Sequence, residues 1–89
     1  MSPIALKLLT LAYENYEKTS NKAFSYQFKN ADDMFYSTEA AQQLYDDGYI
    51  ENVSDFVFET SVSIFSGPIC FDITSSGIKY MRSYRESQS

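Results

Sequence analysis

The spacing of the apolar residues changes at Gly48, and this change limits the folds that the chain can adopt. In two segments before Gly48, residues 3–18 and 38–47, apolar residues recur three or four positions apart, as in the buried stripe of an amphipathic helix. After it, apolar and polar residues alternate over residues 56–65 and again over residues 69–73, which is the period of a strand. A chain that combines segregated helices with a late β-hairpin is predicted to have an α+β fold.

The first helix is predicted over residues 3–18. Ser2 is a suitable N-cap, and Pro3 is favoured at the first helical position because its missing N–H has no partner there. The apolar positions that follow at helical spacing are Ile4, Leu8, Leu11, Ala12 and Tyr16. Aromatic and polar residues then alternate over residues 24–29, which indicates a short strand or an extended arm.

Two helical segments are predicted in the middle of the chain. Residues 30–35 are expected to form a brief helical turn. Ser37 precedes a second segment, a helix over residues 38–47, and Gly48 stands where a left-handed residue ends a helix.

The last third of the chain is predicted to form a hairpin and a final helix. The hairpin spans about residues 55–73, with its turn at residues 66–68. Thr74 can cap the final helix, in which Ile78, Met81 and Tyr84 recur every third residue. Residues 85–89 are polar and are expected to fray.

The composition is that of one small intracellular domain. The chain has 89 residues, of which 44% are hydrophobic, so residues 1–89 are expected to form a single domain with one core. Cys70 is the only cysteine, which excludes an intramolecular disulfide, and no apolar run reaches the length of a membrane span. The start of the chain lacks the basic segment of a secretory signal. We therefore expect a soluble cytoplasmic protein.

The charges are segregated along the sequence. Residues 30–78 contain nine carboxylates and no lysine or arginine, which gives that stretch a net charge of −9. The two flanks hold all seven cations and three glutamates, a net charge of +4. The acidic stretch includes the predicted helix over residues 38–47 and the hairpin.

Two local strings carry a resemblance to a known fold. Residues 40–50 (AAQQLYDDGYI) resemble the end of the third helix of a winged helix-turn-helix domain and the start of its wing strand. Residues 73–81 (ITSSGIKYM) are similar to the joint between the wing and the following helix. Together they resemble the YjcQ-like winged-helix proteins of Gram-positive bacteria and their phages. The resemblance implies a winged helix, with three or four helices, a β-hairpin wing and a short extra strand, in a phage or bacterial setting. It implies no reaction and no particular partner.

The charge of the third helix departs from that of DNA-reading members of this fold. Such helices offer Arg, Lys, Asn or Gln to bases and phosphates, whereas three carboxylates would face the phosphates here. The candidate partner-binding residues on this helix and the wing are Glu39, Gln42, Gln43, Asp46, Asp47 and Glu59. An acidic surface of this kind favours a basic protein partner. A more specific hypothesis is that the surface mimics nucleic acid and occupies the basic nucleic-acid channel of another protein.

Catalysis is not expected from this sequence. There is no histidine, so imidazole bases, catalytic triads and histidine-containing metal sites are excluded. Cys70 lies in an alternating strand without a basic neighbour in sequence, which favours a structural thiol. Adjacent carboxylates such as Asp46 and Asp47 point about 100° apart on a helix and do not converge on one atom. We expect no enzyme activity, cofactor, metal or small-molecule substrate.

Two further expectations concern partners. An apolar strip on the hairpin suggests a homodimer. The alternative is that helices and loops of the same chain cover this strip. A DNA-binding transcriptional regulator is the alternative function, and it would use the cations Lys79, Arg82 and Arg85 of the last helix. Those cations are otherwise explained as a solvated helix face near the negative end of the helix dipole.

Overall fold

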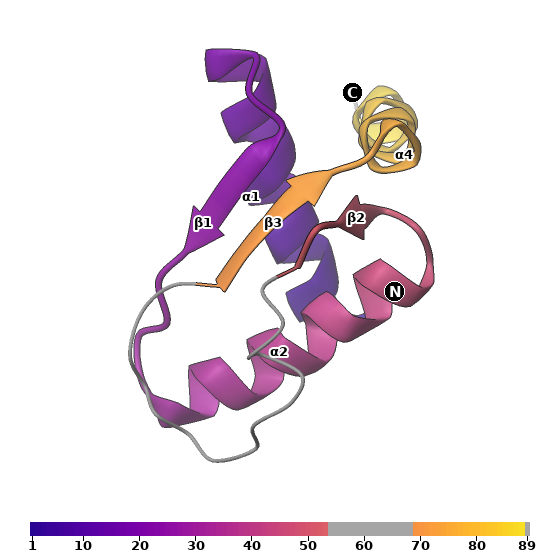
Figure 1. Cartoon of the computed structure of the whole chain (residues 1–89). Helices are drawn as coiled ribbons and strands as arrows, with labels where there is room; N and C mark the ends of the chain where they lie inside the picture. The colour runs from indigo at the N-terminus through magenta and orange to yellow at the C-terminus, as the bar shows by residue number, and fades with distance from the viewer. Residues whose placement is uncertain (54–68, 89) are drawn as a thin grey trace.

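The structure is a computed structural model that describes residues 1–53 and 69–88 (Figure 1). In this part of the chain the elements follow one another as helix, strand, helix, strand, strand and helix. The fold is therefore mixed α+β, as the sequence predicts. The predicted strand over residues 56–65, the turn at residues 66–68 and the candidate residue Glu59 lie outside the described residues.

Helix α1, Pro3–Thr19, confirms the first predicted helix. The hydroxyl of Ser2 accepts a hydrogen bond of 3.2 Å from the N–H of Ala5, so Ser2 is the N-cap. Ser20 ends the helix in a left-handed backbone conformation with φ 59°. Leu8 and Leu9 of α1 are fully buried and form the centre of the core.

Helix α2, Ala31–Asp46, is continuous, so the predicted division into a turn at 30–35 and a helix at 38–47 is wrong. Asn30 caps the helix by accepting a hydrogen bond of 2.8 Å from the N–H of Asp33. Ser37 is buried within the helix, and its hydroxyl donates to Asp33 Oδ1 at 3.1 Å. Because this hydroxyl has a partner one turn earlier, it does not compete for the backbone and interrupt the helix.

The predicted role of Gly48 as a helix terminator is confirmed. Gly48 has φ 80°, and its N–H donates to the carbonyl of Tyr45 at 3.1 Å. The N–H of Tyr49 reaches back to the carbonyl of Leu44 at 2.9 Å. These two bonds form a Schellman motif, which satisfies the last carbonyls of α2 and turns the chain into the next strand.

A three-stranded antiparallel sheet packs on the helices. Its strands are β1 (Ala23–Tyr26), β2 (Ile50–Glu51) and β3 (Ile69–Ile73), in the order β1-β3-β2. In the register of the sheet, Phe24 lies opposite Phe71, and Ile50 lies opposite Ile73. Alternate residues of β3 are buried while Cys70 is exposed, so one face of the sheet covers the core.

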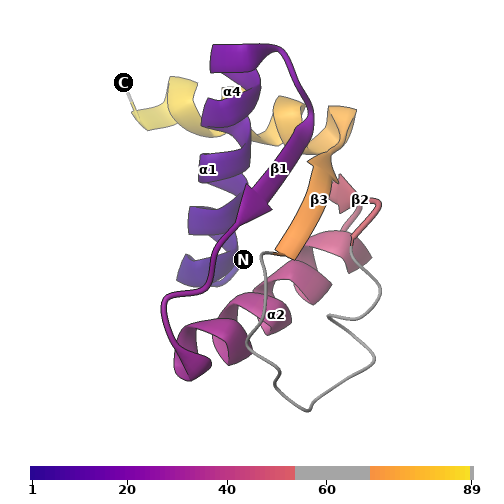
Figure 2. The same cartoon turned by 60° about the vertical axis from the view of Figure 1, so that its left-hand side comes forward.

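Helix α4, Ser75–Gln88, completes the described structure. Thr74 caps it as predicted, since Thr74 Oγ1 accepts a hydrogen bond of 3.1 Å from the N–H of Gly77. The helix extends to Gln88 and so includes most of the segment that the sequence predicts to fray. Figures 1 and 2 show α2 and α4 crossing α1 near its opposite ends, with the sheet alongside.

Candidate interaction surfaces

The solvent-facing side of α2 carries carboxylates and exposed aromatic rings. Its exposed residues within one arc of the helix define the α2 outer face: Asp32, Phe35, Tyr36, Glu39, Gln43 and Asp46. The opposite side of the helix is buried through Ser37, Ala40, Ala41 and Leu44. The continuity of α2 is what brings both halves of this set onto one surface.

Carboxylates recur along the α2 outer face at a fixed interval. Asp32, Glu39 and Asp46 are each seven residues apart, so they lie nearly in line along the helix. At a rise of 1.5 Å per residue the interval is about 10.5 Å. No lysine or arginine occurs in α2 to neutralise them.

An aromatic pair lies between the first two of these carboxylates. The rings of Phe35 and Tyr36 are 5.4 Å apart between centroids and meet edge to face at 83°. The residues are 58% and 52% exposed, and with Tyr45 they make up three of the four large hydrophobic residues exposed in the described part of the chain. Large exposed rings beside unpaired charges are typical of an interaction surface.

The structure places most of the predicted partner-binding residues on or beside this face. Glu39, Gln43 and Asp46 belong to it, and Gln42 lies half-buried at its edge. The Gln42 amide donates a hydrogen bond of 2.9 Å to Asp46 Oδ1. The Gln43 amide oxygen accepts one of 3.4 Å from the N–H of Ser2, which joins α2 to the start of α1. Asp47 is exposed at the C-terminal end of the helix.

The aromatic pair was not among the predicted site residues. The sequence places Phe35 in a separate helical turn, where its relation to Glu39 is undefined. The sequence does contain a pattern that could have identified the pair. Asp32, Phe35, Tyr36 and Glu39 are three or four residues apart, so they are neighbours if the helix is continuous.

Asp33 is part of the acidic stretch but faces the interior. Its Oδ2 accepts hydrogen bonds of 2.8 Å from the Tyr26 hydroxyl and 2.9 Å from the N–H of Lys29. Partial burial acts to raise the pKa of Asp33, but those bonds, the Ser37 hydroxyl and the charge of Lys7 outweigh it and lower the pKa. Burial and the bond to Asp33 raise the pKa of Tyr26. Asp33 therefore joins β1 to α2, and its carboxylate oxygens are engaged within the chain.

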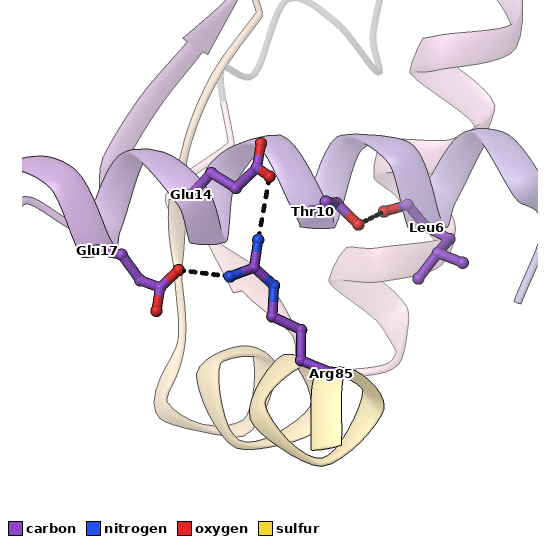
Figure 3. A network of polar contacts seen from close by, with 5 residues as sticks. All are labelled: Leu6, Thr10, Glu14, Glu17 and Arg85. Atoms are coloured by element: carbon purple, nitrogen blue, oxygen red, sulfur yellow. Dashed lines mark hydrogen bonds and ion pairs between the residues drawn. The ribbon is translucent and has the colours of Figure 1, made fainter. Parts of the chain in front are cut away.

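The three candidate cations of α4 are placed differently from one another. Lys79 and Arg82 are exposed. Arg85 points toward α1, where its guanidinium contacts Glu14 Oε2 at 3.0 Å and Glu17 Oε1 at 2.9 Å (Figure 3). Two carboxylates therefore neutralise Arg85, and it would reach a phosphate only by leaving both.

Cys70 is the remaining reactive side chain of the described sheet. It is exposed, whereas the sequence left open whether it is buried, and its sulfur lies 3.3 Å from the Ser25 hydroxyl across the β1–β3 pair. Among the described residues, no group of three or more Asp, Glu or Cys side chains is arranged to hold a metal ion.

Comparison of the chain with protein-family models, with curated proteins and with solved structures finds no match. In residues 1–53 and 69–88, none of the helices combines the length and the apolar character needed to cross a bilayer.

Proposed function

We propose that the protein is a non-enzymatic interaction module that binds a basic protein partner through the α2 outer face. The observation that carries the proposal is the combination of two features: a line of carboxylates that no lysine or arginine of the described residues pairs with, and two aromatic rings that are more than half exposed. Aromatic rings supply contact area, and carboxylates attract a basic surface and reject acidic ones.

A winged-helix identity is part of the proposal. It is supported by the order of the elements and by the contact between the two resemblance strings, because the N–H of Thr74 donates to the carbonyl of Tyr49 at 3.0 Å. The departure is α2, which is one helix where a helix-turn-helix has two. A YjcQ-like member with a fused central helix would be suited to present a long straight surface.

A protein partner is favoured over DNA by the distribution of charge. The α2 outer face repels phosphate, and the exposed cations on α4 reduce to Lys79 and Arg82 once Arg85 is paired with α1. Two phosphate contacts release few counterions and give weak binding. The DNA-binding regulator thus remains the alternative that an experiment must exclude.

The spacing of the carboxylates tests the hypothesis that the α2 outer face mimics nucleic acid. Phosphates on one strand of a duplex succeed each other about every 3.4 Å along the axis. The carboxylates of the α2 outer face recur about every 10.5 Å, with aromatic rings between two of them. This arrangement favours recognition of a protein over imitation of a phosphate backbone.

A second copy of the chain is a less suitable occupant of this face. In a two-fold symmetric contact the same patch meets itself, so the carboxylates of Asp32, Glu39 and Asp46 would face their equivalents. Like charges at an interface cost several kilocalories per mole. A homodimer, if formed, would have to use another surface.

The test is affinity capture from the native host with charge-reversal variants on and off the α2 outer face. We expect the wild-type chain to retain a basic protein that elutes as salt is raised to about 0.5 M, where charges are strongly screened. The double variant Glu39→Lys, Asp46→Lys should lose this protein, and Glu51→Lys, on β2, should keep it. Equal retention by both variants would contradict the proposal.

The alternative is tested in parallel with a pool of duplex DNA. We expect no saturable change in fluorescence anisotropy at about 50 mM salt, where phosphate contacts are strong. Binding that is weakened by Lys79→Ala and Arg82→Ala would instead support a DNA-binding regulator.

A further inference from the structure

Building on the proposed function, which assigns a protein partner to the α2 outer face, we infer that this face takes arginine side chains spaced seven residues apart on a helix of the partner. The chemistry comes from a contact within the chain itself, and the spacing comes from the geometry of α2.

The contact within the chain is the binding of Arg85 by α1 (Figure 3). Its guanidinium bridges Glu14 and Glu17. The guanidinium carbon also lies over the ring of Tyr13, 5.3 Å from the ring centroid. The fold thus holds an arginine with an aromatic ring and with a glutamate four residues after that ring.

A planar guanidinium can stack flat on a ring and donate two parallel hydrogen bonds to a carboxylate at the same time. An ammonium group can also lie over a ring, as Lys7 Nζ does at 5.9 Å from the centroid of Tyr26, but it has no plane to stack and no fork of donors.

The α2 outer face repeats one part of this arrangement, a ring followed four residues later by a glutamate, and there the ring is exposed and no arginine of the described chain is bound. Glu39 follows Phe35 by four residues, as Glu17 follows Tyr13. Asp32 supplies a second carboxylate one turn before the rings. The described part of the chain places no lysine or arginine in an ion pair with Asp32 or Glu39, so an arginine from outside would find both available.

The seven-residue interval identifies a helix as the matching backbone. On a partner helix, arginines seven residues apart lie on one face and about 10.5 Å apart, the interval of Asp32, Glu39 and Asp46. Residues on one face of a strand are about 6.6 or 13 Å apart and miss it. A polyproline helix repeats every 9.3 Å or so and falls behind by more than 2 Å over two intervals.

The experiment uses synthetic peptides of about 20 residues, long enough to be helical, on a background of alanine and glutamine. One peptide carries two arginines seven residues apart with a leucine between them, and a second has lysines in place of the arginines. A third has the arginines five residues apart, which puts them on different faces. Each is titrated into the full-length, isotope-labelled chain at low salt and followed by NMR.

We expect the seven-spaced arginine peptide to shift the resonances of Phe35, Tyr36 and Glu39. It should bind about threefold or more tightly than the lysine peptide, because a guanidinium stacks on a ring and pairs with a carboxylate in a way that an ammonium does not. Phe35→Ala and Glu39→Gln should each remove this preference. Tyr45→Ala, which truncates an exposed ring outside the α2 outer face, should keep it. A circular dichroism spectrum of each variant checks that it is folded.

The outcomes separate this inference from the proposed function. Equal binding of the arginine and lysine peptides at α2 would overturn the arginine preference while leaving a basic partner in place. Equal binding of the peptides with seven-residue and five-residue arginine spacing would overturn the inference that the arginines lie on one face of a partner helix. Shifts confined to α4, or no binding of any peptide, would overturn the inference, and partner capture with the Glu39→Lys, Asp46→Lys variant would still decide the proposed function.

Discussion

The hydroxyl of Thr74 donates a hydrogen bond of 2.6 Å to the carbonyl oxygen of Gly48. The same hydroxyl oxygen accepts from the N–H of Gly77, and the N–H of Thr74 donates to the carbonyl of Tyr49. One residue therefore caps α4 and ties it to the turn that ends α2. The rings of Tyr49 and Tyr80, 5.0 Å apart, extend the contact beyond the backbone.

Removing the Thr74 hydroxyl should destabilise the protein. Thr74→Val keeps the branched shape but loses both the cap and the bond to Gly48, so we expect the free energy of unfolding to fall by about 1 to 2 kcal/mol. Thr74→Ser retains the hydroxyl and should lose less than half as much. Urea unfolding followed by circular dichroism measures both, and a Val variant as stable as wild type would contradict this role.

Gly77, in the first turn of α4, lies against the backbone of Tyr49, which follows the turn that ends α2. A Cβ atom at this position would overlap with the carbonyl oxygen of Tyr49 and crowd Ile73. We expect Gly77→Ala to destabilise by about 1 to 3 kcal/mol, as overpacking does, although alanine is favoured over glycine within a helix by about 1 kcal/mol. Ser76→Ala, at the exposed neighbouring position, is the control and should change stability by less than about 0.5 kcal/mol. A stabilised Gly77→Ala variant would show that the two elements are not in contact.

The continuity of α2 can be tested with proline at Thr38. If a new helix began after Ser37, residue 38 would be its first residue and proline would be tolerated there. In the continuous helix, proline removes a hydrogen bond and clashes with the preceding turn, which costs about 3 kcal/mol or more. Ala31→Pro is the control, because Ala31 is the first residue of α2 and follows Asn30, whose extended backbone suits a residue before proline. Equal unfolding midpoints for the two variants would favour two helices.

Local signals in the sequence were sufficient for three of the helix ends. Ser2 and Pro3 begin α1, Gly48 ends α2, and Thr74 caps α4, as predicted. Each depends on a residue type whose preference is set by the backbone within a few positions. The alternation of β3 likewise reflects a strand that is buried on one face.

The partners of individual side chains were the part that the sequence did not provide. Ser37 resembles a helix cap, and only the position of its hydroxyl beside Asp33 shows it to be an interior residue. Arg85 lies in a polar segment predicted to fray, and its partners Glu17 and Glu14 are 68 and 71 residues away. The candidate site was predicted in its acidic half, since charge is visible in the sequence. The exposure of its aromatic half depends on the packing of α2.

The dependence of stability on pH should report the Asp33–Tyr26 contact. Because the pKa of Asp33 is lowered from 3.8 on folding, its contribution is present above that value and is lost as the pH falls through the lower folded pKa. The pKa of Tyr26 is raised from 10.0, so its contribution is present below pH 10.0 and is lost as the pH rises through the higher folded pKa. We expect Asp33→Asn to flatten the acid side of the curve of unfolding free energy against pH, and Tyr26→Phe to flatten its alkaline side. Urea unfolding across pH measures both.

Tyr26→Phe should also raise the pKa of the Asp33 carboxyl, which NMR titration measures directly. Asp32→Asn, which makes the same change in net charge outside this network, is the matched control. An acid limb in Asp33→Asn as steep as that of Asp32→Asn would mean that Asp33 does not join β1 to α2 in solution.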